Sequence, residues 1–147
     1  MIYNIIYVSK AHSPMSEKQL TSLLEESRSW NEEYGITGML LYIEGQEPGQ
    51  TPGRFMQVIE GAEKDIQLLF SRIKADPRHH QITPLHQDYI NKRNFTNWLM
   101  GFKTVSNDTL IKDGYIDLND YFLKTNRQPK FSLALNYLKS FNDMNLK

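Results

Sequence analysis

Gln57 has neighbours that are unusual for an amide side chain. Residues 54–60 are typical of a β-strand, because they are rich in aromatic and β-branched side chains and are followed by Gly61. Alternation along this strand places Gln57 on one face with Phe55 and Ile59. A buried amide without partners costs about 1–3 kcal/mol, so we expect Gln57 to be hydrogen-bonded. Since an amide both donates and accepts hydrogen bonds, Gln57 is either a satisfied core residue or a functional one.

Asn31 is a second amide at an apolar position. A helix is predicted around it, and Leu20 and Leu24 mark the apolar face of that helix. Asn31 follows Leu24 by seven residues and so projects from the same face, either as a satisfied core amide or as a ligand contact. Tyr7 lies in residues 2–9, which are also typical of a strand. Periodicity leaves open whether Tyr7 and Gln57 face each other on neighbouring strands.

Common enzyme signatures are absent from the sequence. It has no glycine-rich phosphate loop before a Lys-Ser/Thr pair and no Gly-x-Ser-x-Gly. The four histidines give little support for a metal site, because His79 and His80 are adjacent and would point apart while the other two stand alone. Glu60 and Asp76 could act as general acid and base, but we expect solvated carboxylates because no partner lies beside them. We therefore expect neither an enzyme nor a metal site.

Composition narrows the class of protein further. The 147 residues suffice for one domain, and 17 basic residues balance 17 acidic ones, which argues against a dedicated nucleic-acid binder. There is no cysteine, so disulfides, zinc-thiolate sites and thiol chemistry are excluded. The apolar start at residues 1–8 has no basic leader and no cleavage site, and no segment has the length of a membrane span. We expect a soluble, cytoplasmic protein without a membrane partner.

Seven elements are predicted within the first 103 residues. One helix begins at Ser16, whose side chain can form a capping box with Gln19, and ends at Gly35. A second helix stops before Pro77. Pro84 indicates an edge strand or a bulge. The strands are expected at residues 2–9, 36–44, 54–60, 81–90 and 95–102.

This order predicts an α+β, ferredoxin-like βαββαββ fold with both helices on one face of a mixed sheet. Residues 45–53 are rich in glycine and proline, which predicts a hairpin connection with an excursion. The tail, residues 104–147, carries apolar residues at helical spacing and needs a surface to cover. We expect it to pack on the free face of the sheet, near the last strand, or on another subunit. These apolar residues include Leu118, Tyr121, Phe122, Phe131, Ala134, Leu135 and Leu138.

Over about residues 1–103 the sequence resembles the BLUF domains, which are blue-light sensors that use flavin. No single motif is decisive, but the joint order and spacing of several short motifs are specific. The motifs are Ile6-Tyr7-Val8-Ser9, residues 27–31, Gly35-Ile36-Thr37-Gly38, Phe55-Met56-Gln57-Val58-Ile59-Glu60-Gly61, Arg72-Ile73, Asp76-Pro77-Arg78-His79, Arg93-Asn94-Phe95 and Trp98-Leu99-Met100.

The resemblance implies a role for each matching residue. Tyr7 would give an electron and a proton to the light-excited flavin, and Gln57 would bridge Tyr7 and the N5/O4 edge of the flavin. Asn31 would hydrogen-bond the polar edge of the isoalloxazine ring. A phenol suits its role because an excited flavin can oxidise it, and an amide suits the relay because turning it over reverses its hydrogen-bond polarity. Further positions would lie near the flavin and its side chain: Arg72, Ile73, Asp76 and His79.

Other matches would lie beside the photochemical pair. Ser9 corresponds to a polar neighbour of Tyr7 and Gln57, and Trp98 and Met100 correspond to a pair whose exchange between inside and outside has been proposed, and disputed, as the signal. Two departures from the family pattern are visible. Residues 45–53 form an insertion, and Trp30 stands where the family often has asparagine, so that packing could replace one polar contact.

The resemblance therefore predicts a light-sensing switch rather than an enzyme. Residues 1–103 would be the photosensor, and residues 104–147 would serve packing, oligomerisation and output. FAD is the expected cofactor, with FMN and riboflavin as alternatives, and a second copy and a downstream signalling protein are the expected partners. One alternative is a ferredoxin-like module without photochemistry that binds a small molecule or RNA. Another is a small phosphatase of this fold class, which would need an anion-binding loop that the sequence lacks.

Overall fold

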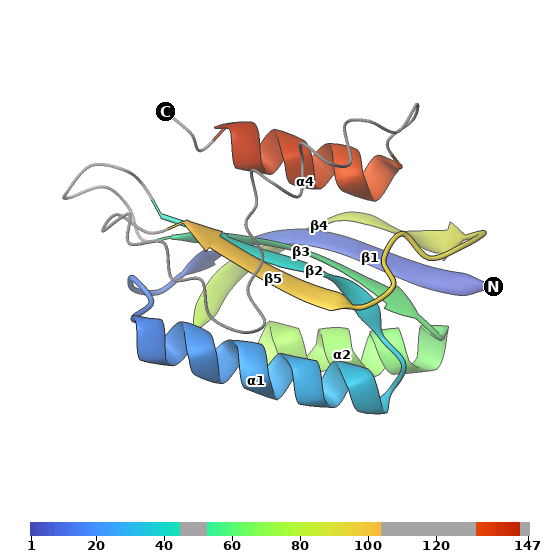
Figure 1. Cartoon of the computed structure of the whole chain (residues 1–147), viewed down its shortest axis with the longest axis horizontal. Helices are drawn as coiled ribbons and strands as arrows, with labels where there is room; N and C mark the ends of the chain where they lie inside the picture. Colours follow the sequence, from blue (N-terminus) through green and yellow to red (C-terminus); the bar gives the residue numbers. More distant parts are fainter. Residues whose placement is uncertain (45–52, 104–131, 145–147) are drawn as a thin grey trace.

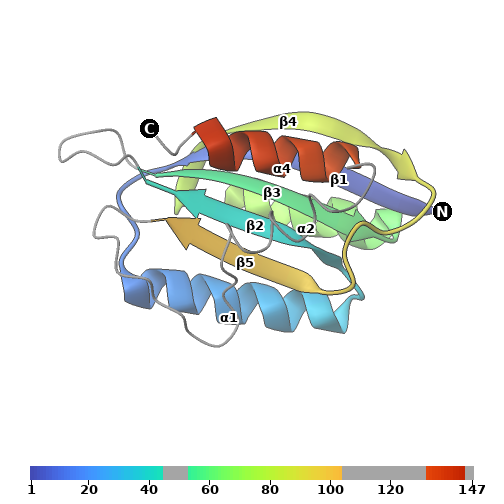
Figure 2. The ribbon, with the colours of Figure 1, turned by 45° about the horizontal axis from the view of Figure 1, so that its top comes forward.

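One mixed sheet of five strands organises the computed structural model, which describes residues 1–44, 53–103 and 132–144. The strand order is β4-β1-β3-β2-β5 (Figure 2). β2 and β5 are parallel, and the other neighbours are antiparallel. The bounds are β1 (Ile2–Ala11), β2 (Thr37–Ile43), β3 (Arg54–Gly61), β4 (His79–Ile90) and β5 (Trp98–Lys103).

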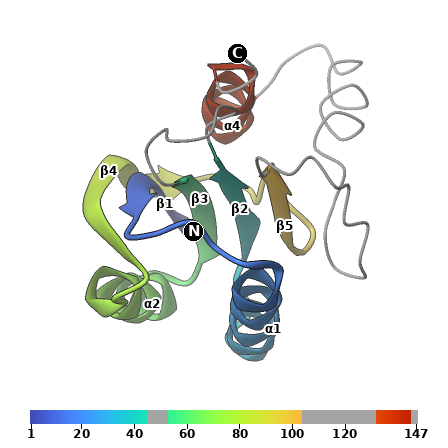
Figure 3. The same cartoon turned by 90° about the vertical axis from the view of Figure 1, so that its left-hand side faces the viewer.

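The chain runs β-α-β-β-α-β-β, as predicted. Helix α1 (Glu17–Glu33) connects β1 to β2, and helix α2 (Glu63–Ala75) connects β3 to β4. Each connection skips one strand, because β3 lies between β1 and β2 and β1 lies between β3 and β4. Figures 1 and 3 show α1 and α2 together on one face of the sheet. The predicted ferredoxin-like α+β class is therefore confirmed, with β5 at one edge.

Local signals set the ends of these helices. Ser16 and Gln19 form the predicted capping box, in which each accepts a hydrogen bond from the backbone N–H of the other. Gly35, directly after the helix cap, has a φ of 64°, a left-handed conformation that glycine adopts without strain. Pro84 lies in the edge strand β4 and pairs with Tyr7 of β1. The next residue pair is Ile6 with His86, so that the register between β1 and β4 shifts by one residue at this point. The predicted edge strand and bulge are confirmed.

A third helix, α4 (Leu133–Met144), covers the opposite face of the sheet (Figure 1). The expectation that the tail packs on this free face is confirmed for these residues. The tail was also expected near the last strand, and Leu99 of β5 does pack against the apolar cluster that contains the α4 residues. The side chains of Trp98 and Met100 on the same strand belong instead to the cluster with Leu20 and Leu24 of α1, on the other face. The apolar residues of α4 in this contact are Ala134, Leu135, Leu138 and Phe141.

Several predictions fall outside the described residues. These are the hairpin excursion at 45–52, the stretch that follows residue 103, and the positions of Leu118, Tyr121, Phe122 and Phe131. Within the described ranges, no helix is long and apolar enough to cross a membrane.

The expectation that Glu60 is a solvated carboxylate was wrong. Its side chain is fully buried and accepts hydrogen bonds from the Thr37 hydroxyl and from the backbone N–H groups of Asn94 and Phe95, at 2.8–3.0 Å. These donors come from β2 and from the segment before β5. Glu60 therefore holds that segment against the end of β3.

Candidate functional site

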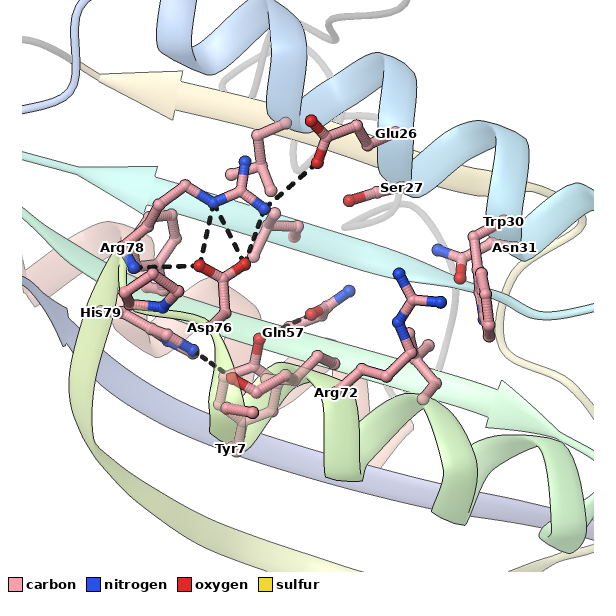
Figure 4. A pocket seen from close by; sticks show the side chains of 17 residues that line it. Tyr7, Glu26, Ser27, Trp30, Asn31, Gln57, Arg72, Asp76, Arg78 and His79 are labelled. Atoms are coloured by element: carbon pink, nitrogen blue, oxygen red, sulfur yellow. Dashed lines mark hydrogen bonds and ion pairs between the residues drawn. The ribbon is translucent and has the colours of Figure 1, made fainter.

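A pocket of about 660 Å³ lies between α1 and α2, with β1, β2 and β3 at its floor (Figure 4). The two apolar clusters on this side of the sheet lie beside it, one under α1 and one under α2. The structure brings seven of the predicted site residues together in its lining: Tyr7, Asn31, Gln57, Arg72, Ile73, Asp76 and His79.

Tyr7 and Gln57 form the centre of the floor. They are direct register partners on β1 and β3, and both side chains are buried. The Tyr7 hydroxyl donates to Gln57 Oε1 at 2.6 Å. Burial raises the pKa of the Tyr7 phenol far above its usual range, and the charge of Asp76 raises this pKa further. Tyr7 therefore keeps its proton, and the Gln57 nitrogen points into the pocket (Figure 4).

His79 supports this floor from the start of β4. Its ring lies edge-on to Tyr7, with the centroids 6.3 Å apart. His79 Nε2 lies 2.6 Å from the carbonyl oxygen of Ile73 and, because a carbonyl only accepts, this nitrogen must carry a proton. In the neutral ring Nδ1 is then the acceptor, and Ser9 Oγ donates to it at 2.7 Å. Ser9 thus lies behind His79 rather than in the pocket lining.

Asn31 forms part of the opposite wall, on α1. Its side chain is 1% exposed, and its Oδ1 has no hydrogen-bond partner among the described residues. A buried unsatisfied acceptor is costly, and one that borders a pocket is suited to a ligand donor. Asn31 and Gln57 thus present amide groups to the pocket from α1 and from the sheet (Figure 4).

Arg78 joins the two sides of the pocket at one end. Its guanidinium binds Asp76 Oδ2 at 2.6 Å and Glu26 of α1 at 3.3 Å. Burial opposes ionisation of Asp76, but hydrogen bonds and attraction from Arg78 outweigh it and lower the pKa of this carboxyl. The hydrogen bonds that Arg78 donates to Asp76 raise the pKa of Arg78 in turn. Asp76 thus acts through an ion pair, which corrects the expectation of a solvated carboxylate.

Arg72 and Trp30 meet between the helices. The Arg72 guanidinium lies 3.8 Å from the centroid of the Trp30 ring, which is a cation–π distance. Trp30 also packs on Tyr34, with ring centroids 4.6 Å apart. Trp30 thus packs against two neighbouring side chains, and the replacement of a polar flavin contact at position 30 stays a prediction.

Trp98 and Met100 do not line the pocket. Both are buried in the cluster under α1, together with Leu40 and Phe55, which do line it. Leu40 pairs with Gln57 across β2 and β3 and with Met100 across β2 and β5. Leu40 therefore lies between Met100 and Gln57 in the sheet.

Sequence reasoning assigned no site role to Glu26 and Ser27, which also line the pocket. A signal was present, because Leu23, Glu26, Ser27 and Trp30 follow the three- and four-residue spacing of one helix face. That face lies beside the apolar face of α1, which Leu20 and Leu24 mark, and it contains the acidic side chain of Glu26. As a whole, the site suits a flat, largely apolar ligand with one polar edge.

Comparisons with known proteins agree with this geometry. A family model described as sensors of blue-light using FAD matches residues 2–101. The chain is 32% identical over 89 residues to photoactivated adenylate cyclase subunit beta of Euglena gracilis, which covers 60% of this chain and 9% of that protein. This chain therefore spans only a small part of the length of that relative.

Two solved structures have a similar fold. Klebsiella pneumoniae BlrP1 with FMN and cyclic diGMP is 29% identical, with a TM-score of 0.69 over 96% of this chain and 34% of that one. The dark-state structure of BlrB, a BLUF protein, is 30% identical, with a TM-score of 0.58 over 69% of this chain and 70% of that one.

Proposed function

The chain belongs to the BLUF family of blue-light sensors that use FAD, and we propose that it binds a flavin non-covalently and uses Tyr7 and Gln57 as its photochemical switch. The observation that carries the proposal is the 2.6 Å hydrogen bond from Tyr7 to Gln57 on the pocket floor. FAD is the proposed flavin, after the description of the family. FMN is the alternative, since it is the flavin named with the related BlrP1.

The residues of the pocket fit such a group. Leu23, Leu40 and Ile73 supply apolar surface for a flat ring system. The unpartnered Asn31 Oδ1 is an acceptor, which suits the ring N–H of a flavin, and the Gln57 amide nitrogen suits its N5 and O4 acceptors. The pocket volume lies in the range of small-molecule sites. Asn31, Gln57 and the two apolar walls would therefore hold the ring.

When bound, the flavin supplies a strong oxidant on absorbing blue light. Tyr7 is an oxidisable residue that already has an acceptor for its proton, Gln57 Oε1. The electron and the proton would both return to Tyr7, and rotation of the amide would reverse the donor and acceptor ends of Gln57. The side of Gln57 that faces the pocket then changes its hydrogen-bonding character without any covalent change to the protein.

We place the output outside the pocket. β3 carries Gln57 on one face and Met56 and Val58 on the other. Met56 and Val58 belong to the same apolar cluster as the α4 residues Ala134, Leu135, Leu138 and Phe141. A rearrangement at Gln57 would reach α4 through this strand and alter a surface that a separate partner or a second copy reads. The chain covers only part of its cyclase relative, so we assign it the sensing step and no catalytic one.

The test replaces the two switch residues. Tyr7→Phe and Gln57→Leu should retain bound flavin and lose the light-induced shift of its absorption spectrum. Tyr3→Phe is the matched control, because Tyr3 lies on the same face of β1, outside the pocket lining, and should keep the shift. A normal reversible shift in Tyr7→Phe would contradict the mechanism. The unchanged protein, expressed in a flavin-replete host, should release flavin when it is denatured. If it releases none, a module without photochemistry is favoured.

A further inference from the structure

A second oxidisable side chain lines the same pocket as Tyr7. Trp30 is half-buried on α1, where its indole contacts the ring of Tyr34. The guanidinium of Arg72 reaches the indole from α2 (Figure 4). An indole can give an electron to an excited flavin, as a phenol can. Trp30 is thus a potential competitor of Tyr7 for the same oxidant.

Tyr7 and Trp30 differ in whether a neighbouring group can accept the proton of the oxidised side chain. The Tyr7 hydroxyl has an acceptor at 2.6 Å. Trp30 Nε1 is buried without a hydrogen-bond partner in the part of the chain that the structure describes. An indole that loses an electron there keeps its proton and becomes a cation, whereas Tyr7 can lose electron and proton together and stay neutral.

Arg72 therefore acts on Trp30 selectively. Its positive charge lies 3.8 Å from the ring centroid and is attracted to the neutral indole, but would repel an indole cation. In the described residues no carboxylate pairs with this guanidinium, unlike that of Arg78, which Asp76 and Glu26 bind. Arg72 is an exposed residue, so water screens part of this charge, but no acidic side chain of the described residues neutralises it at the ring.

We propose that Arg72, stacked on Trp30, suppresses electron donation from Trp30 and so directs oxidation by the light-excited flavin to Tyr7. This inference rests on the proposed function. In the competing event one electron leaves the indole for the excited flavin and later returns, with no bond formed or broken and no proton moved. Such an event consumes excitation without turning Gln57, and the guanidinium makes it less favourable.

The experiment measures the fluorescence lifetime of the bound flavin, transient absorption of the indole radical, and the yield of the spectral shift. Arg72→Gln should shorten the lifetime about twofold, since a cation–π contact at a half-exposed site is modest in strength. The indole radical signal should grow, and the yield should fall. Arg72→Lys keeps the charge and should restore most of the lifetime.

Two further variants separate this role from a structural one. Trp30→Phe in the Arg72→Gln background should abolish the extra quenching and the radical signal, because phenylalanine is not oxidised. Lys74→Gln is a matched control on the same helix, since the Lys74 ammonium lies 5.1 Å from the ring of Phe70, and it should leave the lifetime unchanged. If Arg72→Gln retains too little flavin, Arg72→Met removes the charge and keeps an apolar stem for the same comparison.

An unchanged lifetime in the charge-removing variants would overturn this inference. So would extra quenching in Arg72→Gln that persists when Trp30→Phe is added, because quenching by Tyr7 is common to all of these variants. Neither result touches the assignment of Tyr7 and Gln57. Failure of the unchanged protein to bind any flavin would instead overturn the proposed function.

Discussion

Burial affects Tyr7 and Asp76 differently because the two residues have different partners. Burial raises the pKa of Tyr7, the nearby charge of Asp76 raises it further, and the phenol stays protonated. For Asp76 the hydrogen bonds and charge of Arg78 outweigh burial, and the carboxyl stays ionised. The hydrogen bond on the pocket floor, from Tyr7 to Gln57, thus joins two neutral groups. The charged groups Asp76, Arg78 and Glu26 lie at the end of the pocket where α1 meets the start of β4.

The lowered pKa of Asp76 predicts how stability depends on pH. A carboxyl whose pKa is lower in the folded state adds stability above its unfolded pKa, near 3.8, and this stability is lost as pH falls through the folded value. Asp76→Asn should therefore lower the free energy of unfolding at pH 7 by about 1 kcal/mol, as expected for a half-exposed ion pair. The deficit should shrink at pH values below 3.8.

Urea denaturation of both proteins at pH 7 and pH 3 measures this difference. Glu25→Gln on the exposed side of α1 is the control, and its effect should be small at both pH values. A deficit that stays constant across the two pH values would mean that the Asp76–Arg78 pair adds no pH-dependent stability.

At the scale of single elements, β3 connects the pocket to the rest of the sheet. Its alternation presents Gln57 to the pocket and Glu60 to the opposite side. Glu60 accepts hydrogen bonds from the segment before β5, and Arg93 of that segment donates to the Glu60 carbonyl at 3.2 Å. One strand therefore holds the switch amide and also anchors the connection that leads to β5.

Glu60→Gln should lower the free energy of unfolding by about 1–3 kcal/mol, because an amide replaces one acceptor oxygen by a donor that faces other donors. The buried N–H groups of Asn94 and Phe95 then compete for the remaining oxygen. Urea denaturation measures the loss, with exposed Glu33→Gln as the control. Equal stabilities of the two variants would contradict an anchoring role for Glu60.

At the scale of the whole molecule, the sheet separates α4 from α1 and α2 (Figure 3), which enclose the pocket. The pocket faces α1 and α2, while α4 covers apolar residues of the other face, among them Met39, Leu41 and Val58. Without α4 these side chains would form an exposed apolar patch. The proposed flavin site and the proposed output surface therefore lie on opposite faces of one sheet.

Removal of residues 104–147 should therefore leave flavin binding and the photocycle in place, with lower stability, and abolish light-dependent assembly. Leu138→Ala is the milder companion, and the cavity that it leaves should lower the free energy of unfolding by about 2–4 kcal/mol. Size-exclusion chromatography of full-length and shortened protein, in the dark and under blue light, measures assembly. If both assemble identically in light and dark, the output surface lies elsewhere.

Sequence alone determined the elements whose signals are local. The capping box at Ser16, the glycine at position 35 and the proline at position 84 act over a few residues, so the ends and edges that they set could be predicted. Alternation also assigned Gln57 to one face of its strand, and the order of elements indicated the fold class. The family's short motifs pointed to seven residues that line one pocket.

Only the tertiary structure decided which of these residues meet. Tyr7 and Gln57 lie 50 positions apart, and their register depends on how β1 and β3 pair. The same holds for the Arg72–Trp30 stack and for the buried Glu60, whose backbone donors lie more than 30 positions further along the chain. The physical reason is that periodicity assigns a side chain to a face, whereas its partners depend on strand register and helix packing, which long-range burial selects.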